Sequence, residues 1–168
     1  LLVLRPADGN ESSGSWKVAI EKRDTPSCLI LTRQNVPNLA GSSIEAVAMG
    51  AYTLVDCEGT PDLILIATGS EVSLAVTAAA QIEAKVRVVS MPCWELFEDQ
   101  SQEYKDSVLP PAVTKRLSIE AAASFGWGRY AAHHVSIETF GASAPGGTCM
   151  KEFGFTVENI VMQAQALL

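Results

Sequence analysis

Two strand-like segments on either side of a helical one constrain the fold of this chain most. The run Leu63 to Ala67 is apolar without alternation, which is typical of a strand covered on both faces. Val86 to Ser90 is predicted to be the next strand. Apolar residues recur at helical spacing between them, at Val72, Ala75, Val76, Ala79 and Ile82. This order predicts a right-handed crossover between two parallel strands, with Ser70 as the N-cap of the helix.

The alternation of strand and helix continues to the end of the chain. Further strands are expected over 51–55, 115–119 and 135–138, and helices over 102–108 and 127–132, with a loop over 141–147. The last helix is signalled by Thr156 as its cap, with Phe155 packing on Ile160. The pattern predicts an α/β fold, a three-layer αβα sandwich whose strands are mostly parallel.

The first part of the chain predicts an incomplete strand-helix-strand piece. Leu1 to Leu4 and Cys28 to Thr32 are its strands, and Asp8 with Glu11 has the form of a capping box. The stripe of Trp16, Ala19 and Ile20 is expected to lie on a sheet. Two strands and one helix cannot bury their own apolar faces, so we expect this chain to be a fragment of a longer protein.

Arg33 is the candidate binding residue, because it follows the strand that ends near Thr32. Ligands of open α/β sheets gather beyond the carboxyl ends of the strands. A guanidinium there offers a planar fork of donors to a phosphate or a carboxylate. The alternative is that Arg33 simply pairs with a nearby carboxylate.

Composition excludes several functions. The formal net charge of −7 comes without any cluster of Lys and Arg, which argues against nucleic-acid binding. No apolar run approaches the roughly 20 residues that cross a bilayer. The four cysteines are scattered, as expected for buried reduced thiols. The adjacent His133 and His134 point different ways in any regular element, so no metal site is expected.

Three other features are given structural interpretations. The turn Gly69-Ser70-Glu71 is interpreted as a helix cap, and an anion cradle is the alternative. Large aromatic residues are expected to be core or interface anchors, at Trp94, Trp127 and Phe125. Glu120 follows a strand and could be a lone buried acid, but no partner is evident from the sequence.

Seven stretches, in order along the chain, closely resemble transketolases. They are 5–11 (RPADGNE), 31–37 (LTRQNVP), 67–72 (ATGSEV), 91–97 (MPCWELF), 104–110 (YKDSVLP), 140–145 (FGASAP) and 153–156 (FGFT). The resemblance implies that residues 1–37 are the end of a pyrimidine-binding domain, 38–50 a linker and 51–168 the C-terminal domain. It also implies a mixed five-stranded sheet in that domain, with the strand at 51–55 antiparallel at one edge.

The resemblance further implies transfer of a two-carbon ketol unit between sugar phosphates, in the pentose phosphate pathway or the Calvin cycle. Arg33 matches the family's arginine that contacts the substrate phosphate. Thiamine diphosphate and magnesium are expected in the intact enzyme. No catalytic, cofactor-binding or metal-binding residue is assigned in this chain, so the fragment alone is expected to be inactive.

The intact parent is expected to be a homodimer in the cytoplasm or the plastid stroma, with neither nucleic acid nor membrane as a partner. Two alternatives stay open at this point. One is a stand-alone α/β module that binds an anion or a protein. The other is a fragment of a related thiamine-dependent enzyme, such as dihydroxyacetone synthase or deoxyxylulose phosphate synthase.

Overall fold

A computed structural model describes all 168 residues, and a mixed five-stranded sheet is its centre. The strands lie in the order β3 (Tyr52–Val55), β5 (Val86–Ser90), β4 (Leu63–Ala67), β6 (Arg116–Ile119) and β7 (His133–Val135). All neighbours are parallel except β3, which pairs antiparallel with β5 at one edge. The predicted mixed sheet with one antiparallel edge strand is confirmed.

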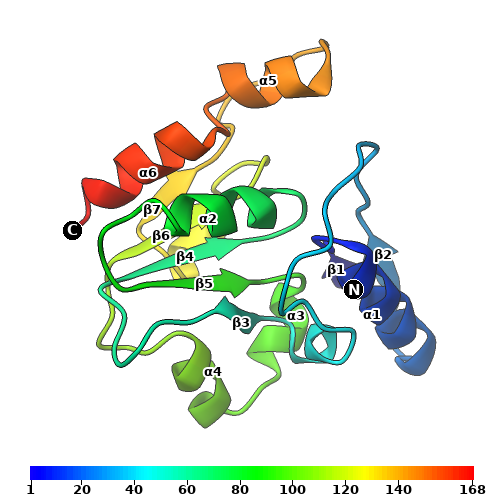
Figure 1. Cartoon of the computed structure of the whole chain (residues 1–168). Helices are drawn as coiled ribbons and strands as arrows, with labels where there is room; N and C mark the ends of the chain where they lie inside the picture. Colours follow the sequence, from blue (N-terminus) through cyan, green and yellow to red (C-terminus); the bar gives the residue numbers. More distant parts are fainter.

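Helices cover both faces of this sheet and give three layers (Figure 1). One face carries α2 (Glu71–Ala79), α5 (Gly146–Glu152) and α6 (Val157–Gln165), and the other carries α3 (Trp94–Glu98), α4 (Gln102–Val108) and the 3-10 helix η2 (Trp127–Arg129). Side chains of β4 alternate between the two cores. Leu63 and Leu65 pack under α2 and α6, whereas Ile64 and Ile66 face the other side. Burial on both faces explains why β4 is apolar throughout.

The two long helices on the first face begin in different ways. Thr156 caps α6 by accepting the Asn159 N–H, and Phe155 and Ile160 are buried in one core, as predicted. Ser70 lies at the N-cap position of α2 but makes no capping hydrogen bond. Its hydroxyl donates to the Glu71 Oε1 at 2.5 Å instead. The predicted Ser70 side-chain cap is therefore wrong, because the backbone of Ser70 is already helical (φ −60°, ψ −22°) and lacks the extended angles of a capping residue.

The first part of the chain forms a small second unit. Its strands β1 (Leu2–Leu4) and β2 (Ser27–Leu29) are parallel, and α1 (Gly9–Glu21) connects them. Asp8 caps α1 by accepting the Glu11 N–H at 2.9 Å, and Glu11 accepts the Ala7 N–H at 2.7 Å. The predicted Asp8 cap is confirmed, but the bond back from Glu11 goes to Ala7, one residue before the cap, rather than to the Asp8 N–H of a standard capping box. A 3-10 helix, η1 (Ala46–Met49), lies in the segment that leads to β3.

Much of this small unit's apolar surface is exposed, as expected for an incomplete piece. Trp16 and Ile20 are 56% and 66% exposed, so their predicted packing on a sheet is wrong for this chain. Gly14 faces η1 instead, where a Cβ would lie 2.4 Å from the Ile44 carbonyl oxygen. The strand expected over 28–32 is shorter, and Leu31 lies outside it with an exposed side chain. The spacing of apolar residues identifies the apolar face of a helix, but it cannot show whether the rest of the chain covers that face or another one.

Some boundaries also differ from the predictions. The last strand runs over His133–Val135 rather than 135–138, because its register pairs His133 with Leu117 and Val135 with Ile119. The helices α3 and α5 were not anticipated. Both are short, and α5 has no buried residue, so neither produces a clear apolar stripe. No helix of the chain has the length and apolarity needed to cross a bilayer.

Candidate functional site

Arg33, the predicted phosphate ligand, lies in the loop that follows β2. Its side chain is exposed, and it takes part in none of the ion pairs of the chain. The alternative in which Arg33 pairs with a nearby carboxylate therefore finds no support within this chain. An exposed, uncompensated guanidinium is chemically suited to bind a phosphate or a carboxylate from outside.

The carboxyl edge of the five-stranded sheet is covered by the start of the chain. In Figure 1 the arrowheads of β4 and β5 point toward the unit of β1, α1 and β2. The Arg5 N–H donates to the Pro92 carbonyl at 2.8 Å, just beyond β5. The Arg5 carbonyl accepts the Gly69 N–H at 3.0 Å, just beyond β4. The chain's own backbone thus covers part of the edge at which α/β sheets bind ligands, and a cavity of about 240 Å³ remains there beside Arg5, Pro92 and Glu120.

An ion-pair cluster joins Arg5 to this edge of the sheet. Glu120 binds Arg5 with one carboxylate oxygen and accepts the Trp127 Nε1–H with the other at 2.5 Å. Glu71, which is 1% exposed, lies 3.6 Å from the Arg5 Nη2 and accepts the Ala121 N–H at 3.0 Å. The interpretation of Glu120 as an acid without a partner is wrong. Its partner Arg5 is 115 positions away, too far for any local pattern to reveal.

The same cluster excludes an open anion cradle at Gly69-Ser70-Glu71. The Gly69 N–H is taken by the Arg5 carbonyl, and the buried Glu71 carboxylate would repel an anion. The turn therefore connects the start of the chain to the sheet, which favours a structural role over an anion cradle. This removes the specific feature on which the stand-alone anion-binding module rested.

A second cluster of hydrogen bonds surrounds Glu11, which is fully buried. Its Oε1 accepts hydrogen bonds from the Tyr52 hydroxyl at 2.7 Å and the Ser90 hydroxyl at 2.5 Å, while its Oε2 accepts the Ala7 N–H. Burial raises the pKa of the Glu11 carboxyl, against the lowering effect of these donors. The carboxylate joins α1 to β3 and β5, so it links the small unit to the large sheet.

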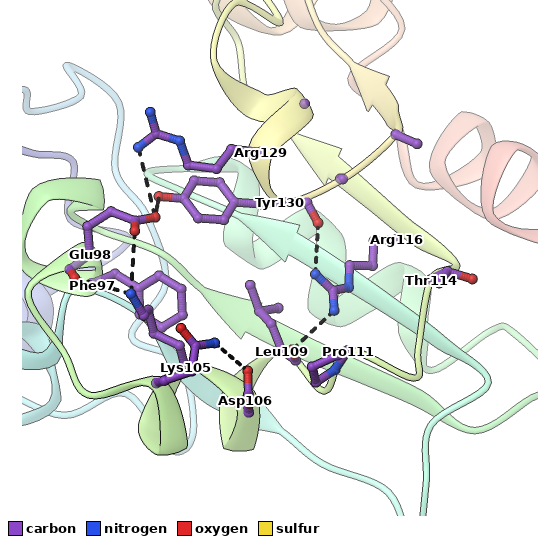
Figure 2. Close-up of a pocket in the computed structure, with 14 residues that line it drawn as sticks. Phe97, Glu98, Lys105, Asp106, Leu109, Pro111, Thr114, Arg116, Arg129 and Tyr130 are labelled. Carbon is purple, nitrogen blue, oxygen red and sulfur yellow. Dashed lines mark hydrogen bonds and ion pairs between the residues drawn. The ribbon is translucent and has the colours of Figure 1, made fainter.

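The hollow in Figure 2 contains charged residues but does not form a site. Its volume is about 480 Å³, and it lies between α3, α4 and the segments around η2. Arg116 donates to the backbone carbonyls of Leu109 and Tyr130 at 3.1 and 3.2 Å. Lys105 and Arg129 both lie near Glu98, at 3.6 and 3.9 Å. Arg116 is thus held by backbone carbonyls, and Lys105 and Arg129 share the carboxylate of Glu98, so these side chains connect neighbouring segments of the fold.

The remaining candidates are structural. Trp127 is buried and lies edge-on to Trp94, with ring centroids 4.9 Å apart, as expected of anchors. Phe125 is 92% exposed, so it is not a core residue, and its role as an interface anchor stays a prediction. The Ser118 hydroxyl and the His134 Nδ1 are 2.7 Å apart. No three His, Cys, Asp or Glu side chains come together as metal ligands. All four cysteines are free, but only Cys93 is buried, so the expected burial is wrong for the other three.

Comparison with known proteins identifies the family. Residues 50–156, well over half of the chain, match the family model described as the transketolase-like TK C-terminal domain. The chain belongs to the transketolase family. It is 60% identical to the transketolase of Nostoc sp. over its whole length, and covers 26% of that protein. It is 51% identical to the chloroplastic transketolase of Zea mays, with 99% of this chain and 26% of that protein covered.

Solved transketolase structures share the fold of the whole chain. The transketolase from Leishmania mexicana superposes with a TM-score of 0.96 at 49% identity, covering 99% of this chain and 25% of that one. The transketolase from Pichia stipitis in complex with sedoheptulose 7-phosphate gives a TM-score of 0.93 at 47% identity, with the same coverage. The chain thus spans about a quarter of the length of the transketolases it matches.

The pH dependence of stability tests the burial of Glu71. Burial raises the pKa of Glu71 above its ordinary 4.5, so the folded chain holds this proton more tightly than the unfolded chain does. The contribution of this tighter proton binding to the free energy of unfolding is fully present below pH 4.5. It is lost as the pH rises through the pKa of Glu71 in the folded chain. Glu71→Gln cannot ionise. We expect its urea unfolding free energy to rise relative to the wild type between about pH 4 and pH 7.

Glu158→Gln is the matched control for this measurement. Glu158 and Glu71 each lie in the first turn of a helix, α6 and α2 respectively. They differ in burial, because Glu158 is exposed and Glu71 is buried. The difference in unfolding free energy between the two variants should therefore change with pH. A difference that stays constant from pH 4 to pH 7 would contradict the expected effect of burial.

Proposed function

We propose that this chain is the C-terminal portion of a transketolase that transfers a two-carbon ketol unit between sugar phosphates. The observation that carries the proposal is similarity over the whole chain, which includes both the small unit with Arg33 and the large sheet. The solved Pichia stipitis relative binds a sugar phosphate, sedoheptulose 7-phosphate, which supports this substrate class. Nothing in the geometry favours dihydroxyacetone synthase or deoxyxylulose phosphate synthase over this assignment.

The proposal assigns the three parts of the chain as the resemblance implies. Residues 1–37 are the end of the pyrimidine-binding domain, 38–50 are a linker, and 51–168 are the C-terminal domain. The exposed apolar residues Trp16 and Ile20 support the first assignment, because an unfinished domain leaves such residues uncovered. The five-stranded sheet with both faces covered supports the last.

Arg33 is the residue through which this chain would contact the substrate. Its exposed guanidinium has no partner in the chain, so it is available for a charge-assisted, bidentate bond to the terminal phosphate of a sugar. The phosphate lies at the far end of the sugar from the reacting carbon. Binding it holds the substrate in the orientation that the reaction needs, without any part in bond making.

Thiamine diphosphate would act as the electron sink of the reaction when bound. No three His, Cys, Asp or Glu side chains of this chain come together, and we assign none of its residues to the cofactor or to the accompanying magnesium ion. The role of this chain in the enzyme is therefore to bind the substrate phosphate and to support the fold. We propose a homodimeric parent in the cytoplasm or the plastid stroma, the latter in line with the relative named as chloroplastic.

A chimera tests the proposed function. This chain replaces the matching quarter of the Nostoc transketolase, and turnover of xylulose 5-phosphate with ribose 5-phosphate is measured. We expect the chimera to be active and the isolated chain to be inactive. A folded chimera without activity would overturn the proposal, and so would turnover by the isolated chain freed of host enzyme.

A further inference from the structure

The loop that carries Arg33 is held at both ends by the small unit. Before Arg33, the Ile30 N–H donates to the Leu4 carbonyl of β1 at 2.8 Å. After it, the Leu39 N–H donates to the Asp8 Oδ2 at 2.9 Å. Between these two points the loop contains no helix or strand. The position of Arg33 therefore depends on where its two ends are fixed.

Asp8 carries out two tasks with its two carboxylate oxygens. Oδ1 accepts the Glu11 N–H and so caps α1, while Oδ2 accepts the Leu39 N–H and so closes the loop. The side chain is held firmly, since Asp8 is only 1% exposed. Next to it, the Asn38 Oδ1 accepts the Gly9 N–H at 3.1 Å, which gives the end of the loop a second bond to the start of α1.

Capping of α1 alone does not explain why Asp8 also uses its second carboxylate oxygen. A serine at this position would cap α1 equally well with a single hydroxyl oxygen. The second oxygen reaches Leu39, 31 positions away, and fixes the loop to the rigid start of a helix. Groups that hold a ligand are effective when their own support is rigid, because a loose loop must be ordered each time a ligand binds.

We propose that Asp8 is a positioning residue for Arg33, and through it for the phosphate group of the sugar substrate. The inference rests on the proposed function, since it assigns Asp8 to the same phosphate site. Asp8 itself does not touch the substrate. It fixes the end of the loop so that the Arg33 guanidinium is already in place when the phosphate arrives.

The test uses Asp8→Ser in the chimera with the Nostoc transketolase. This change retains a helix cap and removes the acceptor for Leu39. At saturating donor, we expect KM for ribose 5-phosphate to rise about tenfold, with kcat within about twofold of the wild type. The kinetics with unphosphorylated ribose should not change, because the loop acts only on the phosphate.

Two controls separate positioning from a general loss of stability. Ser13→Gly weakens α1 at an exposed position away from the loop. It should leave the ratio of KM for ribose 5-phosphate to KM for ribose unchanged. Asp8→Ser combined with Arg33→Ala should have no further effect on ribose 5-phosphate beyond that of Arg33→Ala alone. An additional loss in the double variant would overturn the proposal, because Asp8 would then act independently of Arg33.

Failure of this inference can be told from failure of the proposed function. If Arg33→Ala impairs ribose 5-phosphate selectively but Asp8→Ser does not, only the role of Asp8 is overturned. If Arg33→Ala has no selective effect, the phosphate site itself is overturned. Should Asp8→Ser not fold, Asn38→Ala removes the neighbouring bond to Gly9. It is then expected to raise the same KM about threefold, and an unchanged KM would overturn the inference.

Discussion

Replacing Arg33 with alanine in the active chimera should lower kcat/KM for ribose 5-phosphate. The expected loss of transition-state stabilisation is about 2 kcal/mol, within a range of roughly 1.5 to 3. That corresponds to a loss of about 30-fold. The physical reason is that the variant removes a charge-assisted hydrogen-bond donor that no other group in the chain replaces. Steady-state kinetics with ribose 5-phosphate and with ribose measures the effect.

The decisive quantity is the ratio of kcat/KM for ribose 5-phosphate to kcat/KM for ribose. Arg23→Ala is the matched control, because Arg23 is also an exposed arginine of the small unit, in the turn before β2. Arg23→Ala should change kcat/KM for neither ribose 5-phosphate nor ribose. Equal losses for ribose and ribose 5-phosphate in Arg33→Ala would contradict a phosphate contact and would point to a general effect on the fold.

Replacing Glu11 with alanine is expected to lower the free energy of unfolding by about 3 kcal/mol. The variant leaves the Tyr52 hydroxyl, the Ser90 hydroxyl and the Ala7 N–H buried without their common acceptor. It also separates α1 from the large sheet, which it contacts through this carboxylate. Urea unfolding followed by tryptophan fluorescence measures the change.

Two further variants give this prediction its controls. Glu21→Ala removes an exposed carboxylate from the last turn of the same helix, and should change stability by less than about 0.5 kcal/mol. Glu11→Gln keeps one acceptor oxygen but places an N–H₂ group toward another donor, so its loss should be intermediate. A Glu11→Ala variant as stable as Glu21→Ala would show that the buried hydrogen bonds contribute nothing net.

The capping box at Asp8 and Glu11 shows how far the sequence could be interpreted. The pattern correctly predicted where α1 begins, because a capping box involves residues only three positions apart. It could not predict the second contact of each carboxylate. Asp8 also binds Leu39, and Glu11 binds Ser90, which is 79 positions away. These distant contacts turn a helix cap into the connection between two parts of the protein.

Exposure was the property that sequence patterns predicted least well. The stripe of Trp16 and Ile20 has the spacing of a buried face, yet both side chains face solvent here. Arg33 was found from its place after a strand and from family resemblance. Its exposure and lack of an ion partner became visible only in the folded chain.

By itself, the sequence determined the succession of strands and helices, the crossover from β4 through α2 to β5, and the caps at Asp8 and Thr156. The elements and caps depend on residues within about one helical turn of each other, so local spacing is enough to specify them. The crossover follows from their order along the chain, because parallel strands joined by a helix are connected in one way. Only the tertiary structure decided that Arg5, Glu71 and Glu120 meet at the carboxyl edge of the sheet, and that the start of the chain covers this edge. The reason is that charges distant in sequence are brought together by the strand order, which depends on how the hydrophobic cores pack.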